Sequence, residues 1–441
     1  MSKGLSWFSI FRLGLVQLSI GAIVVMTTST LNRVMVVEWA LPAMLPGALV
    51  GLHYVIQVLR PRWGYGSDVG RRRTPWIIGG MFTLGLGGVL AAVATAWMGA
   101  SIIAGMALAV FAFLLIGCGV GAAGTTLLVF LAVHVDARRR AAAATIVWLM
   151  MIAGLAVTAT LAGGMLDPFS PLRLIIVMAG VSGIAFVMTI VAIWGLETRY
   201  GEQASPEPAS SAETGFMDAI REVWQEPRSR QFAVFVFVSM LAYSTQDLIL
   251  EPFAGAVMGM TPGESTKLAG LQHGGVFMGM ILVALLASGY AKGRFGSMRA
   301  WTIGGCIASA LVLAVLSTAG LYGPAFPLRT VVFLLGLANG AFAVAAIGSM
   351  MGLVRSGREK REGTRMGLWG AAQALAFGLG GFAGAMALDV VRGISGSDVI
   401  GFASVFAIEA VLFVISAYLA AGVSRAVRSQ ALGLTPEVPK S

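Results

Sequence analysis

Three carboxylates lie within or near the ends of long apolar segments of the 441-residue sequence. Asp247 and Glu251 are four positions apart, so they share one face if their segment is helical. Glu409 lies near the middle of another apolar segment. Ionised groups are costly inside a membrane and usually face a cavity, a pathway or a partner there. Because protonation removes much of that cost, Glu409 is a candidate proton carrier, and a hydrogen-bonded structural acid is the equal alternative.

Two histidines, His53 and His273, each follow a Gly-Leu step in an apolar segment. A neutral imidazole is a natural axial ligand for the magnesium of a chlorin, since the neutral ring is the form that binds metals. The preceding glycines, Gly51 and Gly270, would leave space for a flat macrocycle. Buried histidines more often hydrogen-bond to a neighbouring helix, so both interpretations stay open.

The composition indicates a membrane protein with many spans. Hydrophobic residues make up 57% of the chain and charged residues only 11%, against about 25% in soluble domains. So few charges cannot cover a soluble fold of this size, and the chain is too apolar to remain disordered in water. The net charge of +10 does not indicate nucleic-acid binding, because the basic residues lie in short gaps between apolar runs.

The apolar runs predict an all-α membrane protein with twelve transmembrane helices. The expected spans are at about 10–31, 43–59, 76–97, 104–133, 141–163, 172–196, 232–253, 268–288, 300–321, 328–354, 366–388 and 400–422. Most of the 30 Lys and Arg residues lie near the termini or after even-numbered spans. The exceptions on the other side are Arg33, Arg173, Lys267, Arg329 and Arg392. This bias predicts that both termini are cytoplasmic.

A polar connection at 197–231 divides the chain into two halves of six predicted spans. We expect an N-terminal bundle at 1–196, a C-terminal bundle at 232–422 and a cytoplasmic tail at 423–441. Apolar residues at helical spacing within the connection predict a short amphipathic helix on the membrane surface. They are Phe216, Ile220, Val223 and Trp224. A partner-binding helix is the alternative.

A glycine- and arginine-rich loop follows the second predicted span. It carries the pattern G-x-x-x-D-x-G-R-R-R in the residues Gly64, Asp68, Gly70, Arg71, Arg72 and Arg73. The glycines permit a close approach and a tight turn, and the aspartate can accept hydrogen bonds from a helix N-terminus. The pattern resembles the signature loop of the major facilitator superfamily, although Val69 stands where a basic residue is usual. A fainter copy at 289–296 lacks the aspartate. The resemblance implies two six-helix bundles around a central cavity.

Two segments at the outer ends of spans 1 and 7 resemble a narrower family. Residues 30–38 read TLNRVMVVE and residues 246–253 read QDLILEPF. They are similar to the L-N-R-V-M-x-V-E and Q-D-x-L-L-E-P-F/Y segments of the PucC/LhaA-type bacteriochlorophyll-delivery proteins. The stretches Phe11-Arg12-Leu13 and Arg60-Pro61-Arg62 also look similar to that family.

That resemblance implies the inner membrane of a phototrophic bacterium, with bacteriochlorophyll or a precursor as the bound ligand. It also implies light-harvesting or reaction-centre polypeptides and pigment-synthesis enzymes as partners. The polar residues of the two segments are Asn32, Arg33, Glu38, Asp247 and Glu251. Arg33 is placed to pair with the two acids of span 7. The group forms either a structural outer gate or a direct pigment or proton site, and the sequence does not separate the two.

The main hypothesis is therefore a membrane factor for bacteriochlorophyll delivery and assembly of light-harvesting and photosynthetic complexes. One alternative is a proton-coupled exporter of small amphiphiles, which the arginine-rich loop and Glu409 favour. Another is a non-catalytic accessory chain of bacteriochlorophyll synthesis. Polyprenyl transfer needs clustered aspartates that hold magnesium diphosphate. No D-x-x-x-D cluster occurs on a predicted cytoplasmic loop, so we expect no independent enzyme activity.

Overall fold

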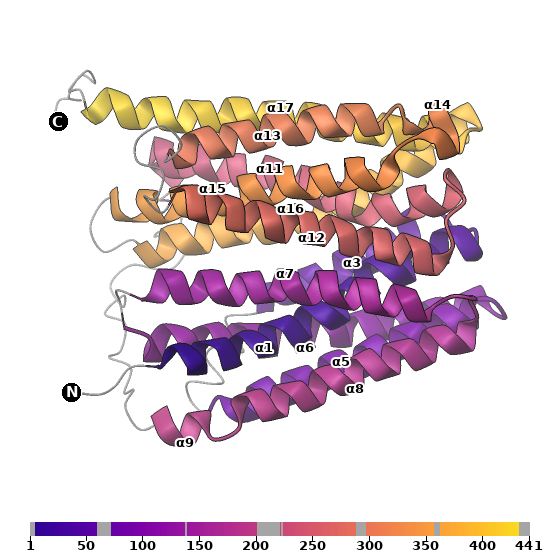
Figure 1. Cartoon of the computed structure of the whole chain (residues 1–441), viewed down its shortest axis with the longest axis horizontal. Helices are drawn as coiled ribbons and strands as arrows, with labels where there is room; N and C mark the ends of the chain where they lie inside the picture. Colours follow the sequence, from indigo (N-terminus) through magenta and orange to yellow (C-terminus); the bar gives the residue numbers. More distant parts are fainter. Residues whose placement is uncertain are drawn as a thin grey trace.

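The computed structural model describes residues 5–59, 72–136, 139–200, 221, 224–287, 297–356 and 362–431, and these ranges contain helices and no strand. The helices run along a common axis (Figure 1). The N-terminal helix set starts with α1 (Trp7–Val25). This helix continues through the π-helical turn η1 (Met26–Thr30), α2 (Leu31–Arg33) and the π-helical turn η2 (Val34–Glu38). The other helices of the set are α3 (Met44–Ile56), α5 (Thr74–Met98), α6 (Ile102–His134), α7 (Arg140–Met165), α8 (Pro171–Ile193) and α9 (Leu196–Tyr200). The C-terminal helix set comprises α11 (Pro227–Ala256), α12 (Pro262–Ala287), α13 (Met298–Leu316), α14 (Ala319–Tyr322), α15 (Leu328–Ser356), α16 (Glu362–Ser395) and α17 (Asp398–Ala431).

Within the described residues, 11 helical segments are long and apolar enough to cross a membrane. Their outward surfaces carry large apolar side chains, such as Ile103 (86% exposed), Leu321 (79%) and Ile394 (84%). Extensive exposed apolar surface of this kind suits lipid rather than water. The chain is a multi-pass membrane protein.

The predicted second span, at 43–59, is the exception in length. Helix α3 has 13 residues and continues as a 3-10 turn over Gln57–Leu59, and residues 60–71 lie outside the described ranges. Helix α17 is longer than the span expected at 400–422. It continues to Ala431, into the segment 423–441 that was expected to be a tail.

The first helix is also longer than the sequence predicts, because it does not end near Leu31 but continues to Glu38. The polar run that reads as the end of a span is helical, and its hydroxyls bond back to the same helix and so need no partner outside it. The hydroxyls of Thr27 and Thr28 donate to the carbonyl oxygen of Val24 at 2.9 and 3.0 Å. Isolated π-helical turns inside α-helices are frequent at functional sites.

The start of α1 and the end of α17 lie at the same end of the bundle, at the left of Figure 1. The opposite end, called here the distal end, includes the C-terminal ends of α7, α11 and α16 and the end of the continuation of α1. The two helix sets contact each other mainly through two helix pairs, α7 with α12 and α3 with α16. The continuation of α1 also packs against α11 and α12 at the distal end.

Small residues bring the paired helices of the two sets close together. A Cβ atom on Gly163 of α7 would lie 2.7 Å from the carbonyl oxygen of Gly263 in α12. A Cβ atom on Gly51 of α3 would lie 3.2 Å from the carbonyl oxygen of Gly378 in α16. Close backbone approach through small residues is typical of helix packing in membranes.

Candidate functional site

The polar residues of segment 30–38 are buried against the C-terminal helix set. Thr30 and Thr266 share a hydrogen bond of 3.1 Å between their hydroxyls, both fully buried. The side-chain amide of Asn32 donates to the carbonyl oxygen of Leu248, on α11, at 2.6 Å. The two segments singled out in the sequence, 30–38 and 246–253, are therefore in direct contact.

Arg33 is the buried charge of this region, with only 2% of its side chain exposed. Its guanidinium forms an ion pair with Glu38, which is 32% exposed. It also donates to the carbonyl oxygen of Met260 at 2.7 Å. The ion pair that the sequence assigned to the acids of span 7 is thus made within the π-helical end of the first helix.

Glu251 lies close to Arg33 and interacts with it electrostatically. One of its oxygens, Oε2, accepts hydrogen bonds from the hydroxyls of Ser265 and Thr266 at 3.2 and 3.3 Å. The other oxygen, Oε1, is buried and has no hydrogen-bond partner among the described residues, and the same holds for Nε of Arg33. A buried carboxylate with one free oxygen can accept a proton or a donor group of a ligand.

Asp247 belongs to a separate polar row, one turn before Glu251 on α11. The side-chain amide of Gln272 donates to its Oδ1 atom at 3.5 Å, and His273 interacts with it electrostatically. The Nδ1 atom of His273 is buried without a hydrogen-bond partner among the described residues. Gln272 was not singled out from the sequence, although a polar side chain next to a histidine in an apolar helix is the signal that marks it.

A third polar row crosses the C-terminal helix set. Ser309 of α13 donates to Asn339 of α15 at 2.7 Å, and Asn339 donates to Gln246 of α11 at 2.8 Å. All three side chains are fully buried. The Nε2 atom of Gln246 has no partner within the described part of the chain. Only Gln246 belongs to a motif that the sequence marked.

Glu409 is fully buried on α17, and neither of its carboxyl oxygens has a hydrogen bond to a described residue. Phe406 and Phe413 are on the same face of α17, three positions before it and four after it. The ring of Phe406 packs on Phe253 with 5.1 Å between centroids, and the ring of Phe413 packs on Phe342 at 5.5 Å. The acid therefore lies in an aromatic environment inside the C-terminal helix set.

His53 is engaged by its own helix. Its Nδ1 atom lies 2.6 Å from the carbonyl oxygen of Val50, and its ring centroid lies 4.0 Å from that of Tyr54. No described contact joins His53 to His273, which lies on α12. Within the described ranges, no cluster of three or more His, Cys, Asp or Glu residues is arranged to hold a metal ion.

Comparison with known proteins decides the family. The family described as PUCC protein matches residues 30–427. The chain belongs to the PucC family. The PucC-family chain is 52% identical over 419 residues to the "Bacteriochlorophyll synthase 44.5 kDa chain" of Rhodobacter capsulatus, covering 95% of this chain and 96% of that relative. It is 29% identical over 424 residues to "Protein PucC" of the same species, covering 92% and 90%.

Solved structures support the all-helical membrane fold of this PucC-family chain. A bacterial homologue of the human lysosomal transporter Spinster superimposes with a TM-score of 0.68, at 14% sequence identity, over 96% of this chain and 98% of that one. This likeness shows the fold alone, which the chain shares with that transporter. The family resemblance stated from the sequence is confirmed.

Most of the arginine-rich loop of the PucC-family chain lies outside the described residues, including Gly64, Asp68, Gly70 and Arg71. Arg72 is exposed and Arg73 is mostly buried at the start of α5. The carboxylate of Glu197, on α9, accepts hydrogen bonds from the backbone N–H groups of Arg73 and Thr74, the latter at 3.1 Å. The helix expected in the linker also lies outside the described residues, apart from Trp224, which is exposed.

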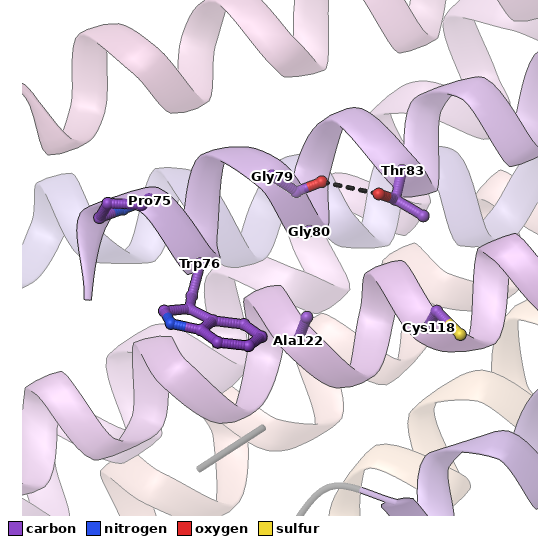
Figure 2. A pocket seen from close by; sticks show the side chains of 7 residues that line it. All are labelled: Pro75, Trp76, Gly79, Gly80, Thr83, Cys118 and Ala122. Atoms are coloured by element: carbon purple, nitrogen blue, oxygen red, sulfur yellow. Dashed lines mark hydrogen bonds between the residues drawn. The ribbon is translucent and has the colours of Figure 1, made fainter. Parts of the chain in front are cut away.

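Two hollows in the PucC-family chain are lined by none of the residues of these polar rows. Figure 2 shows one of about 350 Å³ between α5 and α6, where the hydroxyl of Thr83 donates to the carbonyl oxygen of Gly79 at 2.9 Å. Its lining consists of Pro75, Trp76, Gly79, Gly80, Thr83, Cys118 and Ala122. Another, of about 570 Å³, follows α8 and is lined by apolar residues. Neither hollow is lined by a residue singled out from the sequence.

Proposed function

We propose that this chain is a membrane factor that binds bacteriochlorophyll or a precursor and delivers it during assembly of light-harvesting and photosynthetic complexes. The observation that carries the proposal is the PucC-family match over residues 30–427. The names of two relatives, a bacteriochlorophyll synthase chain and PucC, support the same pigment chemistry. The partners under this proposal are antenna or reaction-centre polypeptides and pigment-synthesis enzymes.

The proposal includes an arrangement in the membrane. The chain crosses the bacterial inner membrane twelve times, with six-helix halves at 1–196 and 232–422, a linker at 197–231 and both termini in the cytoplasm. The distribution of Lys and Arg supports this orientation. The position of the ends of α1 and α17 at the same end of the bundle agrees with an even number of crossings.

The pigment is the cargo in this proposal, and His273 is the residue assigned to its magnesium. Its buried imidazole has a nitrogen without a partner among the described residues, and Asp247 interacts with the ring electrostatically. His53 is the second candidate, and the bond between its Nδ1 atom and the carbonyl oxygen of Val50 is of the kind that metal-ligating histidines make with their other nitrogen. Asn32, Arg33, Glu38 and Glu251 then act as the gate at the distal end, above the pigment path.

Deletion of this chain in its phototrophic host tests the proposed function. Without it, antenna absorption per cell should fall severalfold while pigment synthesis continues, and the full-length chain should restore it. Antenna complexes that accumulate to normal levels in the deletion strain would overturn the proposal. Membrane pigment content is measured in the same cells, so that a loss of pigment synthesis is distinguished from a loss of delivery.

A proton-coupled exporter of small amphiphiles is the second candidate, favoured by the fully buried Glu409 on a transporter fold. Uptake of an amphiphilic dye into inverted vesicles, driven by a pH gradient and abolished by Glu409→Gln, would support it. The absence of gradient-dependent uptake in vesicles that contain folded protein would remove it.

An accessory, non-catalytic role in bacteriochlorophyll synthesis is the third candidate, and the name of the 52% identical relative favours it. Purified protein should not esterify bacteriochlorophyllide by itself. Turnover by the isolated chain would contradict our expectation that it is not an enzyme.

A further inference from the structure

We propose that Asp167 and Asp389 are reciprocal latches that hold the two helix sets together at the distal end. Each is a carboxylate of one set that binds the N-terminus of a helix in the other set. These latches act on the closure of the two helix sets at the distal end, independently of the cargo.

Asp389 of α16 caps helix α3. Its Oδ1 atom accepts a hydrogen bond from the backbone N–H of Ala43 at 3.0 Å, and its Oδ2 atom accepts one from Met44 at 2.8 Å. The residue at the N-cap position of α3 is Ala43, whose side chain cannot accept a hydrogen bond. The cap that Ser, Thr, Asp or Asn usually supplies locally therefore comes from the other helix set.

Asp167, just after α7, binds the start of α12. Its carboxylate accepts a hydrogen bond from the hydroxyl of Thr261 at 2.8 Å and one from the backbone N–H of Gly263 at 3.2 Å. A Cβ atom on Gly263 would collide with this carboxylate, so glycine is needed for the contact.

The start of α12 also has a cap of its own. Thr261 and Glu264 exchange hydrogen bonds of 3.0 and 3.2 Å as a capping box, the arrangement that satisfies a helix N-terminus locally. Asp167 is therefore not needed for the helix to start. Its contribution is the link between α12 and α7.

The two contacts are reciprocal. The N-terminal set supplies the carboxylate after α7 and the helix start of α3, and the C-terminal set supplies the carboxylate of α16 and the helix start of α12. Both contacts lie on the two helix pairs that join the sets, α7 with α12 and α3 with α16. Carboxylates at helix N-termini are favourable because the backbone N–H groups there are unpaired and carry partial positive charge. Separation of the sets at the distal end must break all four hydrogen bonds.

Distance measurement between spin labels on the two sets tests the latches. Labels are attached to cysteines introduced at Ile103 and Leu321, which are exposed at the distal end on different sets. The native Cys118 and Cys306 are first replaced by alanine. The chain with both aspartates intact should give mainly one distance. Asp167→Ala or Asp389→Ala should each raise the population at longer distances, relative to that at the parent distance, about fivefold, the effect expected from loss of one cap. The double variant should raise it further.

Ser395→Ala is the matched control, because Asp398 shares its partner Arg392 with Asp389. Ser395 is an exposed polar residue at the same end, and its hydroxyl donates to the carbonyl oxygen of Val391 at 2.7 Å, within the C-terminal set. Its removal should leave the distance distribution unchanged. The proposal is overturned if the folded double variant gives the same distribution as the parent.

A second variant separates a latch from a simple helix cap. Ala43→Ser supplies a local cap to α3 and so should restore thermal stability to a chain that carries Asp389→Ala. The long distance should persist in that chain, because the link between the sets is still missing. Return of the parent distances on addition of the local cap would also overturn the proposal.

Discussion

The guanidinium of Arg33 lies against Gly255, which is one helical turn after Glu251 on α11. A Cβ atom at Gly255 would come within 2.9 Å of Nη2 and 3.0 Å of Nε. The glycine therefore provides the space in which a buried arginine reaches both the Met260 carbonyl oxygen and the neighbourhood of Glu251.

Gly255→Val should displace Arg33 and lower the free energy of unfolding by about 1–3 kcal/mol, the usual effect of overpacking. Thermal unfolding of the detergent-purified protein measures the loss. Gly304→Val is the matched control, because a Cβ atom at this helical glycine has no neighbour within 4 Å. An equal loss of stability in both variants would contradict the account.

Arg33→Ala should destabilise the protein by about 3 kcal/mol, because it removes the ion-pair partner of Glu38 and the positive charge that interacts with the buried Glu251. Adding Glu251→Gln to that variant should recover part of the loss, since the neutral amide no longer needs the arginine. A double-mutant cycle with thermal unfolding measures the coupling. Arg329, an exposed arginine at the same end, is the control, and Arg329→Ala should change stability by less than about 0.5 kcal/mol. Additive effects of the two buried substitutions would show that Arg33 and Glu251 are not coupled.

The contact between segments 30–38 and 246–253 shows what sequence reasoning can reach. Both segments were identified from their amino-acid sequence alone. In the structure they are joined by the hydrogen bond from the side-chain amide of Asn32 to the carbonyl oxygen of Leu248. The helix boundary near Leu31 was wrong because hydroxyls that bond back to their own helix look, in the sequence, like the end of a span. The bond between Ala43 and Asp389 joins residues 346 positions apart. No local pattern predicts it, because it depends on how two helices pack.

Asn339→Leu should destabilise the protein by about 1–3 kcal/mol, because Gln246 and Ser309 would keep buried polar atoms without partners. Adding Gln246→Leu should recover part of this loss by removing one of those atoms. Thermal unfolding of the single and double variants measures both effects. A double variant that is no more stable than Asn339→Leu alone would show that the polar row is not a connected unit.

His273→Phe should lower the amount of pigment that co-purifies with the chain by at least about tenfold, the scale on which metal sites lose affinity when their ligand environment is disturbed. His53→Phe is compared with it, because His53 is the other candidate ligand, and the two variants together show which histidine holds the pigment. The bacteriochlorophyll to protein ratio after size-exclusion chromatography is the readout. Equal pigment content in His273→Phe and the parent would exclude His273 as the magnesium ligand.

The central claim is that this chain carries bacteriochlorophyll or a precursor. The most direct measurement is the absorption spectrum of the full-length protein purified in mild detergent from pigmented membranes of its host. The account predicts a bacteriochlorophyll-type spectrum that elutes with the protein at a constant ratio across the peak. A folded, monodisperse protein that carries no such pigment, and binds none when bacteriochlorophyll or its precursor is added, would contradict it.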